Sequence, residues 1–268
     1  MTVVKELNHV AIRVANMDES LRLYRDLLGG KVIRDVKGPE GKGHFVYIQL
    51  AQGVIELIQG QPGADNLGLQ HIAFLTAKNE DIHSASDAAR ARGYSFTVEP
   101  KMAASGDGYL AFFKDKGGAT FEFIQRDEDI RIAGLKNERI LEFDHISICV
   151  DDSSRKDTRE LITGILGMKV RRLFEKPGTV MEYYHLGVDT IELLYGENKP
   201  RPTQPIIHIA FRVPCAKEMY RHLTANGITA SEPKESGMGG FFITNATGPD
   251  GEIIEFLDRC SLDEYSPN

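Results

Sequence analysis

The chain has 268 residues, of which 41% are hydrophobic and 26% are charged, and its formal net charge at pH 7 is −7. A chain of this length can bury the core of one large domain or of two ordinary ones. The acidic balance argues against nucleic-acid binding, because contacts with phosphates require clustered Lys and Arg. No apolar run is long enough to span a bilayer and no signal peptide is recognisable, so we expect a cytoplasmic protein with no membrane partner.

A short apolar strand carrying a His, followed about fifty residues later by a strand carrying a Glu, occurs four times in the chain. The four pairs are His9 and Glu56, His71 and Glu122, His145 and Glu192, and His208 and Glu255, with separations of 47, 51, 47 and 47 residues. Four of the eight His residues therefore occupy one position of an internal repeat. Such repetition has to be identified before a fold is assigned.

Each pair lies in a unit that is predicted to form one strand, one helix and three strands. In the first unit an apolar stripe at helical spacing runs through residues 17–30, with Asn16 or Asp18 as its cap and Gly29 and Gly30 at its end. The predicted strands of the first two units are 7–14, 31–36, 44–50, 54–59, 69–76, 94–99, 109–113 and 119–125, and the second predicted helix is 79–93. The third and fourth units begin at Phe143 and Pro205.

Four such units cannot bury their apolar faces separately, so we expect them to pair edge to edge into curved, half-open sheets with the helices outside. The predicted fold is α+β, with four tandem βαβββ modules paired into two domains with cupped mixed sheets. The predicted domains are 1–126 and 141–260, joined by a polar linker at 127–140 and followed by a tail at 261–268.

The segment from His9 to Gly30 resembles the vicinal oxygen chelate superfamily, the group of glyoxalase I, methylmalonyl-CoA epimerase, extradiol dioxygenases and bleomycin resistance proteins. The matching residues are His9, Ser20, Tyr24, Leu28 and Gly29, and the resemblance extends over all four modules. It implies two tandem glyoxalase-like domains. It also implies a metal ion in each cup, held by the first-strand His and last-strand Glu of two paired modules.

The chemistry of the repeated residues points to a metal independently of the resemblance. Side chains alternate across a strand, so Glu56 shares a face with Val54 and Ile58, where an uncompensated carboxylate would be costly to bury. Two imidazoles with two carboxylates suit zinc, nickel, cobalt, manganese or iron(II). The predicted metal ligands are His9, Glu56, His71, Glu122, His145, Glu192, His208 and Glu255.

Two pairings of the modules are compatible with the sequence. Contiguous pairing places the ligands of modules one and two in one cup and those of modules three and four in the other. Swapped pairing joins module one with module four, which brings Arg13 and Arg212 together. Short linkers within each half favour contiguous pairing.

Three further residues are candidates for substrate binding. Arg13 and Arg212 lie four positions after a metal His, on the cup face, where each could bind a substrate carboxylate or phosphate or form an ion pair at the sheet rim. Arg13 matches the position at which glyoxalase I holds a glutathione carboxylate, but Gly60 replaces the family's Asn and argues against glutathione. His185, seven residues before Glu192, faces either the cup or the outside.

These features predict a divalent-metal-dependent lyase or isomerase of the glyoxalase and epimerase type. Its substrate would be a small anionic α-oxo or α-hydroxy compound, and proton transfer would proceed through a metal-chelated enediolate with Glu122 or Glu255 as the general base. The alternative is an iron(II) extradiol ring-cleaving dioxygenase that uses His145, His208 and Glu255. A metal-free protein that sequesters a ligand is a third possibility. We expect a small-molecule partner and a monomer or homodimer.

Overall fold

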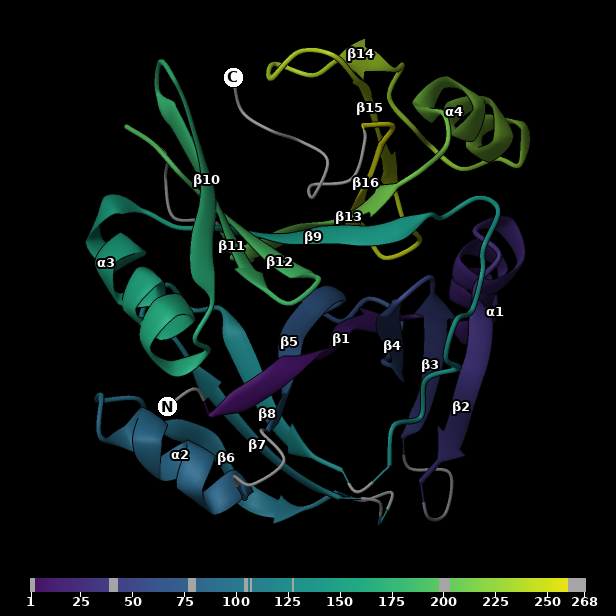
Figure 1. Ribbon diagram of the computed structural model, residues 1–268. Helices are drawn as coiled ribbons and strands as arrows, with labels where there is room; N and C mark the ends of the chain where they lie inside the picture. Colours follow the sequence, from purple (N-terminus) through teal and green to yellow (C-terminus); the bar gives the residue numbers. More distant parts are fainter. Residues whose placement is uncertain are drawn as a thin grey trace.

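Two curved sheets of eight strands each, one above the other, form the framework of the protein (Figure 1). The computed structural model describes residues 3–38, 43–76, 81–103, 106, 108–126, 128–197 and 203–259. The predicted tail, 261–268, lies outside the described residues, as do residues 79 and 80 of the second predicted helix. Within the described ranges, every helix is too short or too polar to cross a membrane.

The first sheet is formed by the first two modules. Its strands in spatial order are β2 (Lys31–Lys37), β3 (His44–Leu50), β4 (Gly53–Gln59), β1 (Val4–Val14), β5 (Gly68–Thr76), β8 (Thr120–Gln125), β7 (Tyr109–Lys114) and β6 (Phe96–Met102). β1 and β5 are antiparallel, whereas β1 pairs in parallel with β4 and β5 with β8. Two modules therefore meet at the centre of one mixed sheet.

The second sheet repeats this arrangement with modules three and four. Its strands in spatial order are β10 (Lys169–Lys176), β11 (Thr179–Leu186), β12 (Asp189–Tyr195), β9 (Glu142–Cys149), β13 (Ile206–Arg212), β16 (Ile253–Leu257), β15 (Phe242–Thr247) and β14 (Lys234–Glu235). The predicted α+β fold of four βαβββ modules is confirmed. The modules pair contiguously, module one with module two and module three with module four, as the short linkers within each half predicted.

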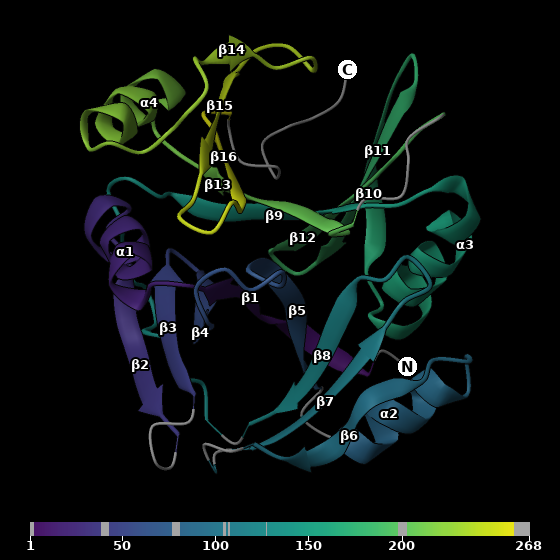
Figure 2. The same cartoon turned by 180° about the vertical axis from the view of Figure 1, so that it is seen from behind.

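The helices lie on the outer faces of the sheets (Figure 2). They are α1 (Met17–Leu21), which continues as the π-helical turn η1 (Arg22–Leu27), α2 (Ile82–Arg90), α3 (Asp152–Glu160), which continues as η3 (Leu161–Ile165), and α4 (Ala216–Ala225). Asn16 caps α1 by accepting hydrogen bonds from two backbone amides of the first turn, and Gly29 follows η1 with φ +74°. A Cβ at Gly30 would lie 2.6 Å from the carbonyl oxygen of Tyr24, so only glycine fits there.

The two halves pack through corresponding contacts on opposite sides of the molecule. On one side, Tyr24 of η1 donates a hydrogen bond of 2.8 Å to Glu252 of module four. On the other, Thr158 of α3 donates one of 2.5 Å to Asp115 of module two. The largest cluster of buried apolar side chains includes residues of both sheets. The two cups are therefore held in a fixed arrangement by a shared core.

A carboxylate at the junction of the halves predicts pH-dependent stability. Asp189 accepts a hydrogen bond of 2.8 Å from the backbone amide of Leu7, and burial, reinforced by Glu6, raises the pKa of Asp189 to about 7. Because this folded-state pKa exceeds the unfolded value of 3.8, ionisation of Asp189 opposes folding. The stability that the protonated carboxyl contributes is therefore lost as the pH rises from about 4 to about 7. We expect Asp189→Asn to melt at least about 2 °C above wild type at pH 8 and to lose this advantage near pH 4.

Thermal melts at several pH values would test this expectation. Asp65→Asn, which removes a charge from the exposed loop before β5, is the matched control and should follow the wild-type curve at every pH. Parallel curves for wild type and Asp189→Asn would contradict the assignment.

Candidate metal centres

The register of the central strands brings the four predicted ligands of the first cup onto one face. Ala11 of β1 lies opposite both Glu56 and His71. Ala73 of β5 lies opposite both His9 and Glu122. Because residues that pair across a sheet project from the same face, the four side chains surround two short alanine side chains, which leave room between them.

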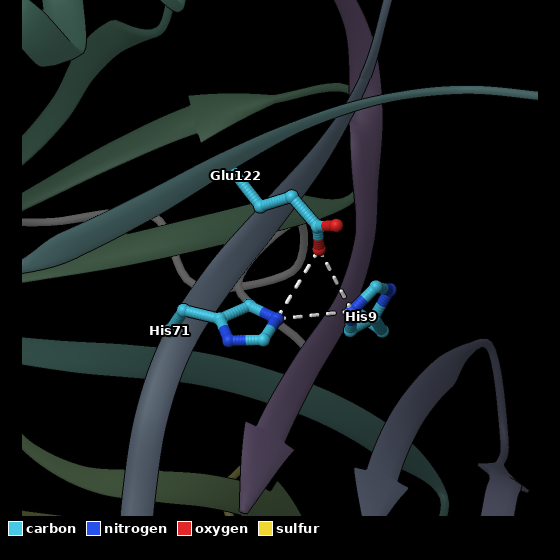
Figure 3. Close-up of side chains that lie close together, drawn as sticks. All are labelled: His9, His71 and Glu122. Carbon is cyan, nitrogen blue, oxygen red and sulfur yellow. Dashed lines mark hydrogen bonds and ion pairs between the residues drawn. The ribbon is translucent and has the colours of Figure 1, made fainter. Parts of the chain in front are cut away.

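Three ligand atoms of the first cup, from His9, His71 and Glu122, all lie close to one another, and Glu56 lies beside both imidazoles. His9 Nε2 is 3.3 Å from His71 Nε2, and Glu122 Oε2 is 3.2 Å from each of these nitrogens (Figure 3). Glu56 Oε2 is 3.2 Å from His9 Nε2 and 3.6 Å from His71 Nε2. All four residues are buried. The structure therefore brings together every residue predicted for this site.

This cluster fits a divalent ion. Ligand atoms bonded at about 2.1 Å and at right angles to one another lie about 3.0 Å apart, close to the spacing observed. Glu122 Oε2 is buried, and no donor of suitable geometry within the described ranges makes a hydrogen bond to it. Asn8 Oδ1 lies 2.8 Å from His9 Nδ1, and a proton on Nδ1 directs the lone pair of Nε2 to the centre of the cluster.

The charges of the first cluster also require a positive partner. Burial alone would lower the pKa of His9, but the carboxylates of Glu56 and Glu122 raise it to about 9. Burial alone would raise the pKa of both carboxyls, but the imidazoles lower it, to about 2 for Glu122. Both carboxylates are thus ionised at neutral pH, and a cation can replace the proton that His9 holds.

The second cup has the same residues in a looser arrangement. His145 Nε2 lies 3.1 Å from His208 Nε2, but Glu192 Oε2 is 3.9 and 3.7 Å from these two atoms. Glu255 Oε1 is 3.8 Å from His145 Nε2. Burial raises the pKa of Glu255 to about 7 and lowers that of His208 to about 4. At neutral pH Glu255 is therefore only partly ionised, and His208 is neutral.

Two neighbours explain why Glu192 is held back from the imidazoles. Ser147 occupies the place of Ala11 and donates a hydrogen bond of 2.5 Å to Glu192 Oε2. Tyr183 donates one of 2.6 Å to Glu192 Oε1. Both oxygens of this carboxylate are therefore engaged by hydroxyl groups of the chain.

The predicted substrate-binding residues have different surroundings. Arg13 Nε is buried without a hydrogen bond to any residue in the described ranges, and its side chain packs on Gly60, where a Cβ would lie 2.9 Å from Arg13 Cγ. Arg212 Nε instead donates a hydrogen bond of 2.8 Å to Glu142 at the sheet rim. His185 shares the cup face with Tyr183, and its Nδ1 lies 3.0 Å from the Thr190 hydroxyl.

Four residues beside the two centres were not among the predicted site residues, although the sequence placed Tyr183 near the second cup. Tyr47 and Tyr183 lie opposite Glu56 and Glu192 in register, and each forms an edge-to-face contact with the first His of its cup, at 5.5 and 5.7 Å. Arg126 and Arg259 lie over these two rings, at 5.0 and 5.9 Å from the ring centroids. Their spacing repeats, since each Tyr precedes its Glu by nine residues and each Arg follows Glu122 or Glu255 by four.

Sequence comparison identifies the family. Residues 6–123 and 142–256 match the Glyoxalase/Bleomycin resistance protein/Dioxygenase superfamily, and the chain belongs to this family. A protein of Brassica oleracea var. gemmifera named "Putative lactoylglutathione lyase" is 30% identical over 187 residues, which are 67% of this chain and 60% of that relative. The chain thus spans less than two thirds of this relative's length.

Solved structures with the same fold include enzymes of two kinds. The Mn(II)-bound glyoxalase from Novosphingobium aromaticivorans is similar with a TM-score of 0.69 at 20% identity, over 99% of this chain and 87% of that one. Homoprotocatechuate 2,3-dioxygenase from Brevibacterium fuscum, in complex with 3,4-dihydroxyphenylacetate, is similar with a TM-score of 0.67 at 19% identity, over 96% of this chain and 81% of that one. At this level of identity the similarity establishes the fold.

The buried ion pair behind His145 predicts a large stability effect. Asp144 lies 2.7 Å from His145 Nδ1 and accepts a hydrogen bond of 2.5 Å from Arg259, and both charged residues are buried. We expect Asp144→Asn to lower the free energy of unfolding by about 3 kcal/mol or more, because it leaves the Arg259 charge without its partner.

Urea unfolding in the presence of a chelator separates this effect from any loss of metal. Asp26→Asn, which breaks the exposed ion pair with Arg25, is the control and should leave stability near that of wild type. An equally stable Asp144→Asn protein would contradict the interpretation.

Proposed function

We propose that the protein is a divalent-metal-dependent lyase or isomerase of the glyoxalase type that moves a proton beside a carbonyl group. Its substrate is a small anionic α-oxo or α-hydroxy compound. The observation that carries this proposal is the buried cluster of His9, His71, Glu56 and Glu122, with Glu122 Oε2 at 3.2 Å from both imidazoles. In the second cup, His145, Glu192, His208 and Glu255 are the corresponding candidates.

The four residues of the first cluster would hold the ion, and a bound divalent ion would polarise two adjacent substrate oxygens and stabilise the enediolate charge. Glu122 is the proposed general base. Its carboxylate is ionised at neutral pH, because the imidazoles lower its pKa to about 2 despite burial, so no bound proton blocks a role as base. Glu56 lies beside the same pair of imidazoles and would return the proton from the opposite side.

Aromatic side chains shield this site from water. The ring of Tyr47 contacts His9 edge to face, and the ring of Phe112 contacts His71 in the same way at 4.9 Å. His9 and Glu122 are only 1% and 3% exposed. Exclusion of water would strengthen the attraction between a bound cation and the negative charge that develops on a substrate, because the local dielectric constant is low.

The relatives suggest which substrate to test first. The name of the Brassica relative contains lactoylglutathione, which is a thioester. This thioester is an isomer of the hemithioacetal that methylglyoxal forms with glutathione. Arg13 remains the candidate for the glutathione carboxylate, whereas Gly60 lacks the amide that the family resemblance would place there. We therefore propose the hemithioacetal as the first assay and small α-oxo acids as the second. Arg212 and His185 are the candidates for substrate contacts in the second cup.

Glu122→Gln tests the mechanism most sharply, because the amide keeps the shape of the side chain and cannot act as a base. We expect kcat to fall by about 10²- to 10⁴-fold, while the metal content per chain is measured in parallel. Glu138→Gln, an exposed change in the linker, is the matched control and should retain full turnover. Undiminished turnover by Glu122→Gln with its metal retained would refute the proposed role.

The second candidate function is an iron(II) ring-cleaving dioxygenase in the second cup. The observation that favours it is the approach of Glu255 Oε1 to 3.8 Å from His145 Nε2, beside His208. Against it, Glu192 lies within 4 Å of both imidazoles, and the three residues placed to share one ion are His145, Glu192 and His208. Stoichiometric oxygen uptake with a catechol would favour the dioxygenase.

A further inference from the structure

One buried hydroxyl group distinguishes the spaces between the ligands of the two cups. In the first cup both residues that lie between the ligands are alanine. In the second cup one of the two remains alanine, Ala210, but the other, opposite Glu192 and His208, is Ser147. Ser147 is fully buried, and a buried hydroxyl is costly to leave without a hydrogen bond. Its acceptor is Glu192 Oε2.

Both oxygens of Glu192 accept hydrogen bonds from hydroxyl groups of the chain. Ser147 bonds to Oε2 at 2.5 Å and Tyr183 to Oε1 at 2.6 Å. Glu192 Oε2 lies 3.9 Å from His145 Nε2 and 3.7 Å from His208 Nε2, whereas neighbouring ligand atoms of one ion lie about 3.0 Å apart. To coordinate an ion fully, Glu192 would have to move inward against two short hydrogen bonds to a charged acceptor, which are among the stronger hydrogen bonds in proteins.

The corresponding carboxylate of the first cup is not held in this way. Glu122 Oε2 lies 3.2 Å from both imidazole nitrogens (Figure 3), and within the described ranges it makes no hydrogen bond. Its neighbours in register are Ala73 and Phe112, whose side chains have no hydrogen-bond donor. The first cup therefore presents a carboxylate that already lies near the ligand spacing and has no competing donor.

The imidazoles of the two cups differ much less than the carboxylates. Asn8 Oδ1 lies 2.8 Å from His9 Nδ1, and Asp144 Oδ1 lies 2.7 Å from His145 Nδ1, so both rings are oriented alike. A carboxylate behind a His makes it a stronger ligand, but Asp144 is also paired with Arg259, which balances its charge. The position of the carboxylates is therefore the main difference between the two sets of ligands.

We propose that Ser147, together with Tyr183, holds Glu192 back from the metal position and makes the second cup the weaker of two divalent-metal sites. The first cup then fills before the second as the concentration of the ion rises. Ser147 and Tyr183 act through Glu192, so they are positioning residues. That both cups bind metal rests on the proposed function, whereas the order of filling is independent of the reaction catalysed.

Titration with zinc(II) in competition with a chromophoric chelator tests this order on the full-length protein after dialysis against a metal-free chelator. Groups that hold a ligand from behind alter metal affinity by about 10- to 100-fold, so we expect a tight first equivalent and a second at least about tenfold weaker. Replacement of His9 and His71 by alanine should remove the tight step. Replacement of His145 and His208 should remove the weak step.

Single substitutions test the role of the hydroxyl groups. Ser147→Ala should tighten the second step by at least about tenfold and leave the first unchanged, and Tyr183→Phe should act in the same direction. Ala11→Ser, the reciprocal change, should weaken the first step, because it places a hydroxyl opposite Glu56. Ser153→Ala, which removes an exposed hydroxyl in α3, is the matched control and should bind both ions as wild type does.

The outcomes separate this inference from the proposed function. Equal affinities in wild type, a tighter ion in the second cup, or an unchanged second step in both Ser147→Ala and Tyr183→Phe would overturn the inference and leave two metal centres intact. Absence of zinc binding to wild type would overturn the inference and the proposed function together. A gain of affinity cannot arise from misfolding, and Tyr183→Phe decides the question if Ser147→Ala fails to fold.

Discussion

The burial of two carboxylates beside two imidazoles is the constraint on which the centre of the first sheet depends. Ionised carboxylates are costly to remove from water unless positive charge lies next to them. The parallel and antiparallel register of β1, β4, β5 and β8 places the four groups on one face, and Ala11 and Ala73 leave the space between them. The surrounding aromatic rings then keep water away, so the cluster is stable only with a proton or a metal ion to balance its charge.

The two cups show how small changes around the same eight residues alter the chemistry available. Ser147 in place of Ala11 draws Glu192 away from the imidazoles, and Asp144 in place of Asn8 pairs with the buried Arg259. The first cup therefore has compact ligand atoms, whereas the second has a looser cluster in which two hydroxyl groups of the chain engage Glu192. These differences favour the first cup as the place where substrate binds.

Much of the fold could be predicted because the sequence pattern that specifies each module is local and is repeated four times. The His-to-Glu spacing identified the modules and all eight residues that the structure gathers into two clusters. The contact of Arg126 with Tyr47 could not be found in this way, because β3 and the segment after β8 meet only when the sheet curves into a cup. The ion pair of Arg212 with Glu142 likewise depends on the register of β13 against β9, which the sequence does not specify.

The most direct test of the central claim is elemental analysis of the full-length protein purified without chelators, expressed as metal ions per chain. We expect one or two equivalents of nickel, zinc, cobalt or manganese in wild type, and the loss of one equivalent when His9 and His71 are both replaced by alanine. A wild-type protein that retains no divalent metal, or a double variant with the full wild-type content, would contradict the assignment of the first cluster as a metal centre.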